Sequence, residues 1–446
     1  MVFIGTTTTT TSSRGSTTTT TPSCSSTCVI VATSTSSRLA FYSFDSNTND
    51  ATGVYPASGI AWPTYTTGYV NMGIYFDASL MQRLSTSPMS LNSRSFTIEF
   101  WFLLVNAAGN TYAFFGQLGA INIGYECLFL AVLSGQLDMG FFNDDIISST
   151  VLQSNTWYHG AFVYDNTIRQ QSIYINGILD KQSLTNINPY LGTSGPMTIG
   201  GADVYGALGI PYFSGIMDHL TVSTRAKNAC EILNDATLAA YFPLDGSLTD
   251  AGPNFLTATA SGASATAGYV NQGAYLSGSN SYIQISSLTG LGRANYSFSI
   301  AFWMYPIIPG VLVHVHTSSD GLGWCTPFMG ISSTGNIIVQ VYNNGGPYII
   351  TGPVIPLNAW THITQTYSPT NGQSLYVNGN LYLTLSNATT YTSSGGQNYV
   401  TIGNLLSGTL CYNPGILQTP IQGIIDELRI YSRELSSIDV CLLVWT

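Results

Sequence analysis

The chain has 446 residues, more than one hydrophobic core usually serves, so at least two domains are expected. Only 7% of the residues are charged, the net charge is −10, and lysine occurs at positions 181 and 227 alone. No basic face can therefore neutralise phosphates or anionic lipid, which excludes nucleic acid as an expected partner. No apolar run approaches the 18 or more residues of a membrane span, so no transmembrane segment is expected.

Residues 1–37 form a low-complexity tail rich in threonine and serine. Such a composition is typical of disordered, O-glycosylated stalks. The apolar stretch at its start is too short for a signal peptide, so no signal peptide is visible in this chain. Sequons at Asn295 and Asn387 predict N-glycosylation, which would suit a secreted protein.

Beyond residue 37 the same motifs occur twice in the same order, which indicates a tandem duplication. We call residues 38–228 module one and residues 236–441 module two; the short segment 228–236 joins them. The offset between the copies grows from 200 to 208, so insertions are expected in loops. The matching segments are 39–45 with 238–245, 68–76 with 268–276, 95–101 with 297–303, 155–159 with 358–362, 174–177 with 376–379, and 213–225 with 421–433.

The period of each module predicts strands. In residues 96–102 the apolar side chains of Phe96, Ile98, Phe100 and Phe102 alternate with others, which places one row of the strand in a core. Module two repeats the pattern in residues 298–304.

Tight hairpins are predicted at Asn176-Gly177 and Asn378-Gly379, because both residues of a type I′ turn take positive φ. Amphipathic helical periodicity is missing, and only a turn near residues 228–233 favours a helix. We therefore predict an all-β protein with two tandem antiparallel β-sandwiches of the jelly-roll type, preceded by the disordered tail.

The ordered motifs Y-x-[FL]-D, [ST]-I-x-F-W, W-x-H, Y-[IV]-N-G and G-x-[IM]-D-x-[LV] resemble the laminin-G-like (concanavalin A-like lectin/glucanase) jelly-roll module. The resemblance covers nearly all of both copies. It implies an extracellular protein that binds glycans or matrix partners, with calcium at the rim of some family members. Because one fold carries many functions, it does not name a ligand.

The candidate catalytic residues are few. Sandwich glycosidases need two carboxylates about 5–10 Å apart, and no such cluster is visible here. Glu99 stands alone in an aromatic strand and faces Ala301 in module two, so a structural role is favoured. His159 and His362 occupy one W-x-H position and are expected to be packed, as are His314 and His316. We predict no catalytic activity; a glycoside hydrolase-related enzyme is the less favoured alternative.

Calcium is the predicted cofactor, because acidic residues recur at matched positions of a chain with few acids. Calcium takes six to eight oxygen ligands. First and last strands often lie side by side in such a sandwich, which would bring three aspartates together in each module. The alternative is that these residues form turns. The candidate ligands are Asp45, Asp50 and Asp218 in module one and Asp245, Asp250 and Asp426 in module two.

Seven cysteines suit an oxidising compartment. Cys325 and Cys411 lie in module two, where an inserted loop would be tied to the sheet by their disulfide. Cys127 occupies the position of Cys325 in module one and is left over as a thiol. Cys28 and Cys230 are a candidate pair that would join the ends of module one, but four flanking cysteines allow three pairings.

The expected function is therefore an extracellular glycan- or matrix-binding adhesion module. The alternative is a structural spacer or protein-interaction array without a small-ligand site. Ligand contacts are expected in loops that differ between the copies, at residues 116–126, 141–147 and 405–418. The sequence identifies no single ligand-binding residue, because tyrosine, asparagine and glycine suit any exposed loop of such a protein.

Overall fold

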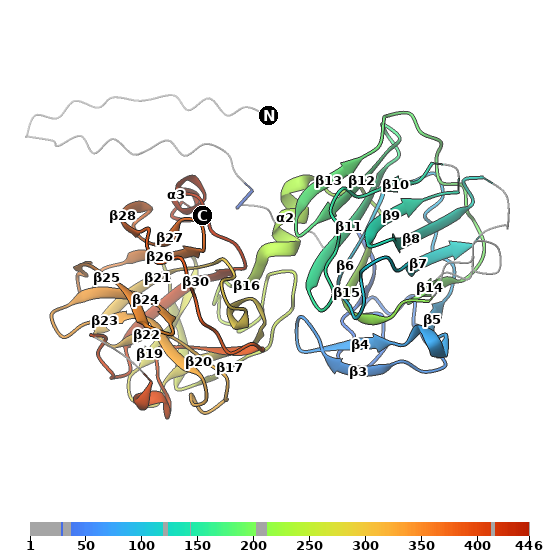
Figure 1. The fold of residues 1–446 in the computed structure, drawn as a ribbon. Helices are drawn as coiled ribbons and strands as arrows, with labels where there is room; N and C mark the ends of the chain where they lie inside the picture. Colours follow the sequence, from blue (N-terminus) through green and yellow to red (C-terminus); the bar gives the residue numbers. More distant parts are fainter. Residues whose placement is uncertain are drawn as a thin grey trace, which may run out of the picture.

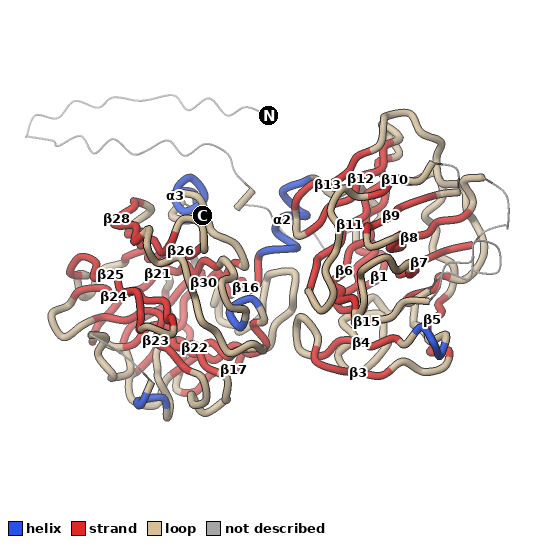
Figure 2. The backbone as a smooth tube through the Cα atoms, viewed as in Figure 1, coloured by secondary structure: helices blue, strands red, loops and turns tan. Residues whose placement is uncertain are grey.

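The computed structural model describes residues 28–29, 37–118, 124–142, 144–201, 212–411 and 415–445. Most of the predicted tail, residues 1–37, lies outside the described residues. The rest forms two antiparallel β-sandwiches, which confirms the predicted fold class (Figures 1 and 2). The sandwich of module one is drawn in blue to green and that of module two in yellow to red.

Module one is built from two facing sheets. The first contains β13 (Ile178–Gln182), β12 (Gln170–Ile175), β11 (Trp157–Asp165), β6 (Phe96–Leu104), β15 (Gly215–Ser223), β4 (Met72–Phe76) and β3 (Thr64–Thr67), with β1 (Arg38–Tyr42) paired to β15. The second contains β10 (Ile146–Ile147), β9 (Gln136–Gly140), β8 (Cys127–Leu133), β7 (Tyr112–Leu118), β14 (Met197–Ile199), β5 (Arg83–Thr86) and β2 (Ser58–Ile60).

Module two repeats this topology strand for strand. Its first sheet contains β18 (Ala263–Ala267), β19 (Gln272–Ser277), β30 (Gln422–Tyr431), β21 (Phe298–Ile308), β26 (Thr361–Ser368), β27 (Gly372–Val377) and β28 (Asn380–Leu385), with β16 (Leu238–Phe242) paired to β30. Its second contains β17 (Ala258–Ser261), β20 (Tyr282–Leu288), β29 (Asn398–Ile402), β22 (Val311–His316), β23 (Cys325–Ile331), β24 (Asn336–Asn343) and β25 (Gly346–Val354).

The predicted apolar row of β6 lies in the core. Phe96, Ile98, Phe100 and Phe102 are all fully buried between the two sheets of module one. The opposite row is buried as well, because Glu99 and Trp101 are covered from outside the sandwich. The alternation of apolar side chains along β6 did not predict that its outward-facing side chains would also be buried.

Both predicted hairpin tips are present, since Asn176, Gly177, Asn378 and Gly379 all have positive φ. A short helix lies against each tip: a Cβ on Gly177 would meet α2, and one on Gly379 would meet α3. The joining segment, in which a turn near residues 228–233 favoured a helix, thus forms α2 and packs on the hairpin of module one. Among the described residues, the helices are α2 (Ala229–Thr237), α3 (Ser437–Leu443) and the 3₁₀ turns η1 (Ala78–Leu80), η2 (Gly290–Gly292) and η3 (Gly408–Leu410).

Both proposed disulfides are formed, Cys28–Cys230 and Cys325–Cys411. Cys127 is a buried thiol outside these bridges, and Cys441 is also disulfide-bonded. The bridge at Cys411 holds the segment that contains η3 against β23, as the insertion in module two predicted.

The two modules share a continuous apolar contact. Tyr69, Val70 and Trp101 of module one belong to the same buried cluster as the core of module two. Further contacts join the modules beside it: the Phe41 and Phe255 rings lie 5.1 Å apart, and Arg38 lies 4.8 Å from the Phe255 ring. The modules are therefore packed against one another rather than merely linked.

We expect the double substitution C325S/C411S to lower the unfolding free energy of module two by about 2–4 kcal/mol. The bridge closes a loop with a sequence separation of 86, and opening it increases the entropy of the unfolded chain. Denaturation in guanidinium chloride would measure the change. An unchanged midpoint would contradict the expectation.

Candidate functional site

A stacked tyrosine and tryptophan occur at the same place in each module. The Tyr69 and Trp101 ring centroids are 3.4 Å apart in module one, and those of Tyr269 and Trp303 are 3.5 Å apart in module two. A histidine from the W-x-H motif packs against the edge of each tryptophan. The two tryptophans thus have like surroundings, as a duplication requires.

Each tyrosine lies in a tight loop that begins with a glycine, and steric crowding explains why this residue is glycine. Asn71 and Asn271 adopt positive φ, and their carbonyl groups accept hydrogen bonds from the N–H groups of Gly68 and Gly268. A Cβ on either glycine would lie 2.6 Å from a carboxylate oxygen of β15 or β30. Glycine is required because the aspartate and the backbone at the far end of the loop both lie too close for a Cβ. We call residues 68–72 and 268–272 the tyrosine loops.

The aspartates predicted as calcium ligands hold these loops through backbone amides. In module one, Asp218 accepts from Val70 N–H at 2.8 Å and Asp45 accepts from Met72 N–H at 3.1 Å. In module two, Asp426 accepts from the N–H groups of both Tyr269 and Val270. Asp245 accepts from Gln272 N–H at 2.9 Å.

Asp50 and Asp250 accept hydrogen bonds from a different segment than the other four aspartates. Asp50 accepts the N–H groups of Phe41 and Tyr55, and Asp250 accepts those of Tyr241 and Leu256. Both side chains therefore shape the turn that follows the first strand of their module.

The predicted three-aspartate calcium clusters are not formed. In the part of the chain that the structure describes, no group of three or more His, Cys, Asp or Glu residues could hold a metal ion. The carboxylate oxygens that would bind calcium instead accept backbone N–H groups, and this gives a physical reason for their matched positions. Burial raises the pKa of Asp426 to about 6, so the carboxylate that holds the loop is ionised at neutral pH.

The tyrosine loop of module one is covered by module two. Gln397 donates its side-chain amide to the carbonyl groups of Gly68 and Asn71, at 3.1 and 3.0 Å. The hydroxyl of Thr289 donates to the carbonyl of Tyr69, and the Tyr69 hydroxyl lies 3.5 Å from that of Ser432. Amide and hydroxyl groups of module two thus donate hydrogen bonds to the backbone carbonyl groups of this loop.

The tyrosine loop of module two has the same geometry but faces outward. Tyr269 is 45% exposed, whereas Tyr69 is 3% exposed. Asn271 and Gln272, beside it, are exposed as well. Module two therefore presents, on its surface, an aromatic ring and a polar loop of the kind that module one uses for a contact.

Glu99, the lone carboxylate of the sequence, is held in a buried ion-pair network. It pairs with Lys227, whose ammonium group also lies 2.8 Å from Asp235. These residues line a cavity of about 30 Å³ at the module boundary, together with His159 and His219. Such a space holds a water molecule or two but no sugar. Burial lowers the pKa of His159 to about 4, so this histidine is neutral at physiological pH.

The other residues singled out in the sequence are either buried in the fold or remain untested as sites. His314 and His316 are buried and bind the carbonyl groups of Gly321 and Ser318. The two sequon residues, Asn295 and Asn387, are exposed, and their glycosylation stays a prediction. Sequence reasoning missed Tyr269, although the repeat of its motif at residues 68–76 and 268–276 was a signal. Only the structure shows that each of the two tyrosines stacks on a tryptophan.

The architecture is that of a tandem lectin-like sandwich, and comparison with known families agrees. The model of the concanavalin A-like lectin/glucanases superfamily matches residues 78–233 and 277–441, more than half of the chain. The protein belongs to this family. No curated protein matches the chain. None of the helices among the described residues has the length and apolar character needed to cross a membrane.

Several solved structures are similar to the chain. Domain 4 of AbnA, an extracellular arabinanase from Geobacillus stearothermophilus solved with arabinotriose, is 21% identical, with 46% of this chain and 98% of that one covered and a TM-score of 0.33. Domains LG4-5 of the mouse laminin alpha1 chain are 14% identical, with 84% and 93% covered and a TM-score of 0.29. The ligand-binding domain of botulinum neurotoxin serotype D, solved with N-acetylneuraminic acid, is 10% identical, with 82% and 96% covered and a TM-score of 0.37.

His219 joins the two modules at the edge of the candidate site. Its Nδ1 lies 2.7 Å from Asp218 Oδ1, and its Nε2 lies 2.9 Å from the carbonyl oxygen of Asn254 in module two. Both partners are acceptors, so the doubly protonated ring satisfies both contacts. Burial lowers the pKa of His219, but Asp218 and the Asn254 carbonyl outweigh burial and leave the pKa raised.

We expect His219 to stabilise the folded protein below about pH 6.5, the ordinary pKa of histidine, and less as the pH rises through its raised folded-state pKa. The comparison is with H219N, since asparagine tolerates the positive φ of this position. Unfolding free energies of both proteins from pH 5.5 to 9 would show the wild-type advantage shrinking with pH. A constant difference would contradict this. Other charged groups near the ring are Asp45, Arg38, Glu99, Lys227 and Asp235.

Proposed function

We propose that this protein is an extracellular, non-catalytic adhesion protein whose second module binds glycans at the tyrosine loop, residues 268–272. The observation that carries the proposal is the difference between the two loops. The same loop is buried against amide and hydroxyl groups in module one and exposed in module two. Sugars offer hydroxyl and amide donors of that kind, and their apolar faces stack on aromatic rings.

The anchoring of the loop supports a binding role. Asp426 and Asp245 fix the backbone from two sides, and Trp303 holds the Tyr269 ring from beneath. A surface that is already ordered loses less conformational entropy when a ligand binds. The fold family and the two disulfides support an extracellular location.

We also propose that the protein is not an enzyme, because its carboxylate side chains are not arranged for glycoside hydrolysis. A glycosidase of this kind needs two carboxylates across an open groove. Glu99 is committed to Lys227 beside a cavity of about 30 Å³, and module two has Ala301 in its place. The four loop-anchoring aspartates accept backbone N–H groups instead of facing a groove.

A protein-interaction array is the rival function, and one observation favours it. The tyrosine loop of module one binds protein groups, namely Gln397, Thr289 and Ser432 of module two. The exposed loop of module two would then bind a partner protein with a similar polar surface, and no saccharide.

We expect wild-type protein to bind saccharides on a glycan array and Y269A to bind them at least about tenfold more weakly. Loss of the ring removes an aromatic contact of about 0.5–1.5 kcal/mol together with its apolar area. Y382A is the matched control, because Tyr382 is 49% exposed at the opposite edge of the same sheet. Absence of saccharide binding by the wild type would contradict the proposal and favour the protein-interaction array.

The calcium prediction is tested by repeating the array with a chelator. Because the six aspartates accept backbone N–H groups, we expect the bound saccharides and their affinities to stay the same. A chelator-dependent loss of binding would instead show that a cation takes part, and it would revive the calcium hypothesis.

A further inference from the structure

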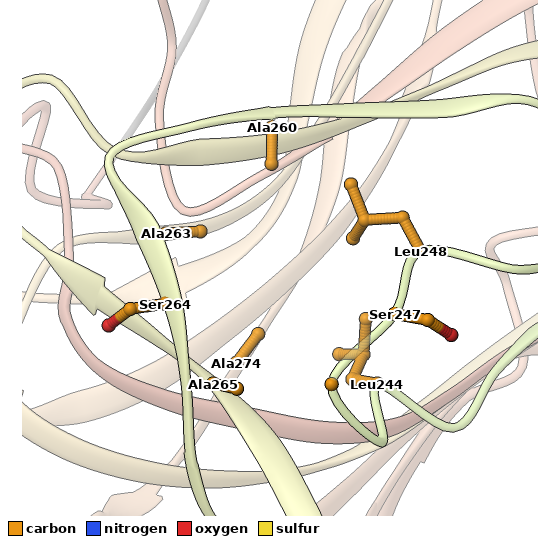
Figure 3. A pocket seen from close by; sticks show the side chains of 9 residues that line it. Leu244, Ser247, Leu248, Ala260, Ala263, Ser264, Ala265 and Ala274 are labelled. Atoms are coloured by element: carbon orange, nitrogen blue, oxygen red, sulfur yellow. The ribbon is translucent and has the colours of Figure 1, made fainter.

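Module two contains an apolar pocket of about 210 Å³ at the open edge of its sandwich (Figure 3). Its wall is formed by Leu244, Leu248, Ala260, Ala263, Ala265 and Ala274. These residues come from the loop after β16, from the edge strand β17 and from the β18–β19 hairpin. The pocket is thus framed by the edge strands of both sheets.

Most side chains that line the pocket are apolar and none is charged, although Ser247 and Ser264 also border it. Figure 3 shows the side chains of Leu248, Ala260 and Ala274 pointing toward the space. The hydroxyl groups of Ser247 and Ser264 point away from it. A polar ligand would find no charged side chain and few polar side chains facing it, which disfavours sugars and ions in this pocket.

The duplication shows what opens the pocket. Ala265 and Ala274 are cross-strand partners in the β18–β19 hairpin. At the matching positions of module one, Tyr65 and Ile74 are partners in the β3–β4 hairpin. Both of these larger side chains pack against the core of module one. Module two has the same backbone pairing with two methyl groups in their place, so a space remains between the sheets.

We infer that this pocket is a second binding site, for a small uncharged apolar molecule of one aromatic ring or a compact branched aliphatic group. The size supports this class, since an apolar cavity of about 150 Å³ holds benzene. Binding there gains from the removal of apolar surface from water at both partners. The site is separate from Tyr269, which lies in the loop at the tip of the hairpin.

Toluene is the probe for this site. In protein labelled at the alanine methyl groups, we expect saturable toluene-induced shifts at Ala260, Ala263, Ala265 and Ala274, because a bound ring changes the magnetic environment of the lining. The double variant A265Y/A274I carries the residues of module one and fills the space. We expect it to lose the saturable shifts at Ala260 and Ala263 while the rest of the spectrum stays that of a folded protein.

Two further variants complete the test. A267L lies on the same strand outside the lining and should keep the toluene response, as should Y269A. If the double variant does not fold, A265L fills the space with one substitution and should weaken toluene binding at least tenfold. Absence of saturable shifts in the wild type, or their persistence in a folded filled variant, would overturn the inference.

Discussion

The hydrogen bonds from the tyrosine-loop amides to Asp218 and Asp426 are the constraint on which the rest of the arrangement depends. A buried carboxylate needs hydrogen-bond donors, and the loop supplies backbone N–H groups that would otherwise lack partners. The close approach excludes a Cβ at Gly68 and Gly268. Each tyrosine ring is thereby fixed on its tryptophan, which lies on a central strand, β6 or β21, of the first sheet of its module.

The two modules use this common element in different ways. Module one buries it against module two, so Tyr69 and Trp101 extend the apolar cluster of the neighbouring core. The corresponding loop of module two is exposed among the described residues. One duplicated structural element thus serves assembly in one copy and remains available for recognition in the other. The pocket beside β18 is a second divergence, since it follows from replacing a large cross-strand pair by two alanines.

Much of the fold was predictable because it depends on local patterns. The alternation in residues 96–102 and the Asn-Gly pairs correctly predicted strands and hairpin tips. The insertion in module two correctly predicted the Cys325–Cys411 bridge. Among the described residues the six aspartates do not form groups of three that could hold a metal ion. Their matched positions indicate a shared role but do not show which donors or ions they bind. The turn near residues 228–233 indicated a helix, but nine residues give too short a pattern to show that α2 packs on a hairpin tip.

The sequence by itself determined the duplication, the all-β class and the matched aspartates and tryptophans, because these follow from repeats and short-range periodicity. Only the tertiary structure decided that one tyrosine is buried and the other exposed. That difference depends on Thr289, Gln397 and Ser432, which lie more than 200 residues from Tyr69 in the chain. Thr289 follows β20, a strand of seven residues where module one has the four-residue β5. The longer strand of module two thus places Thr289, one of these three residues, against the first module.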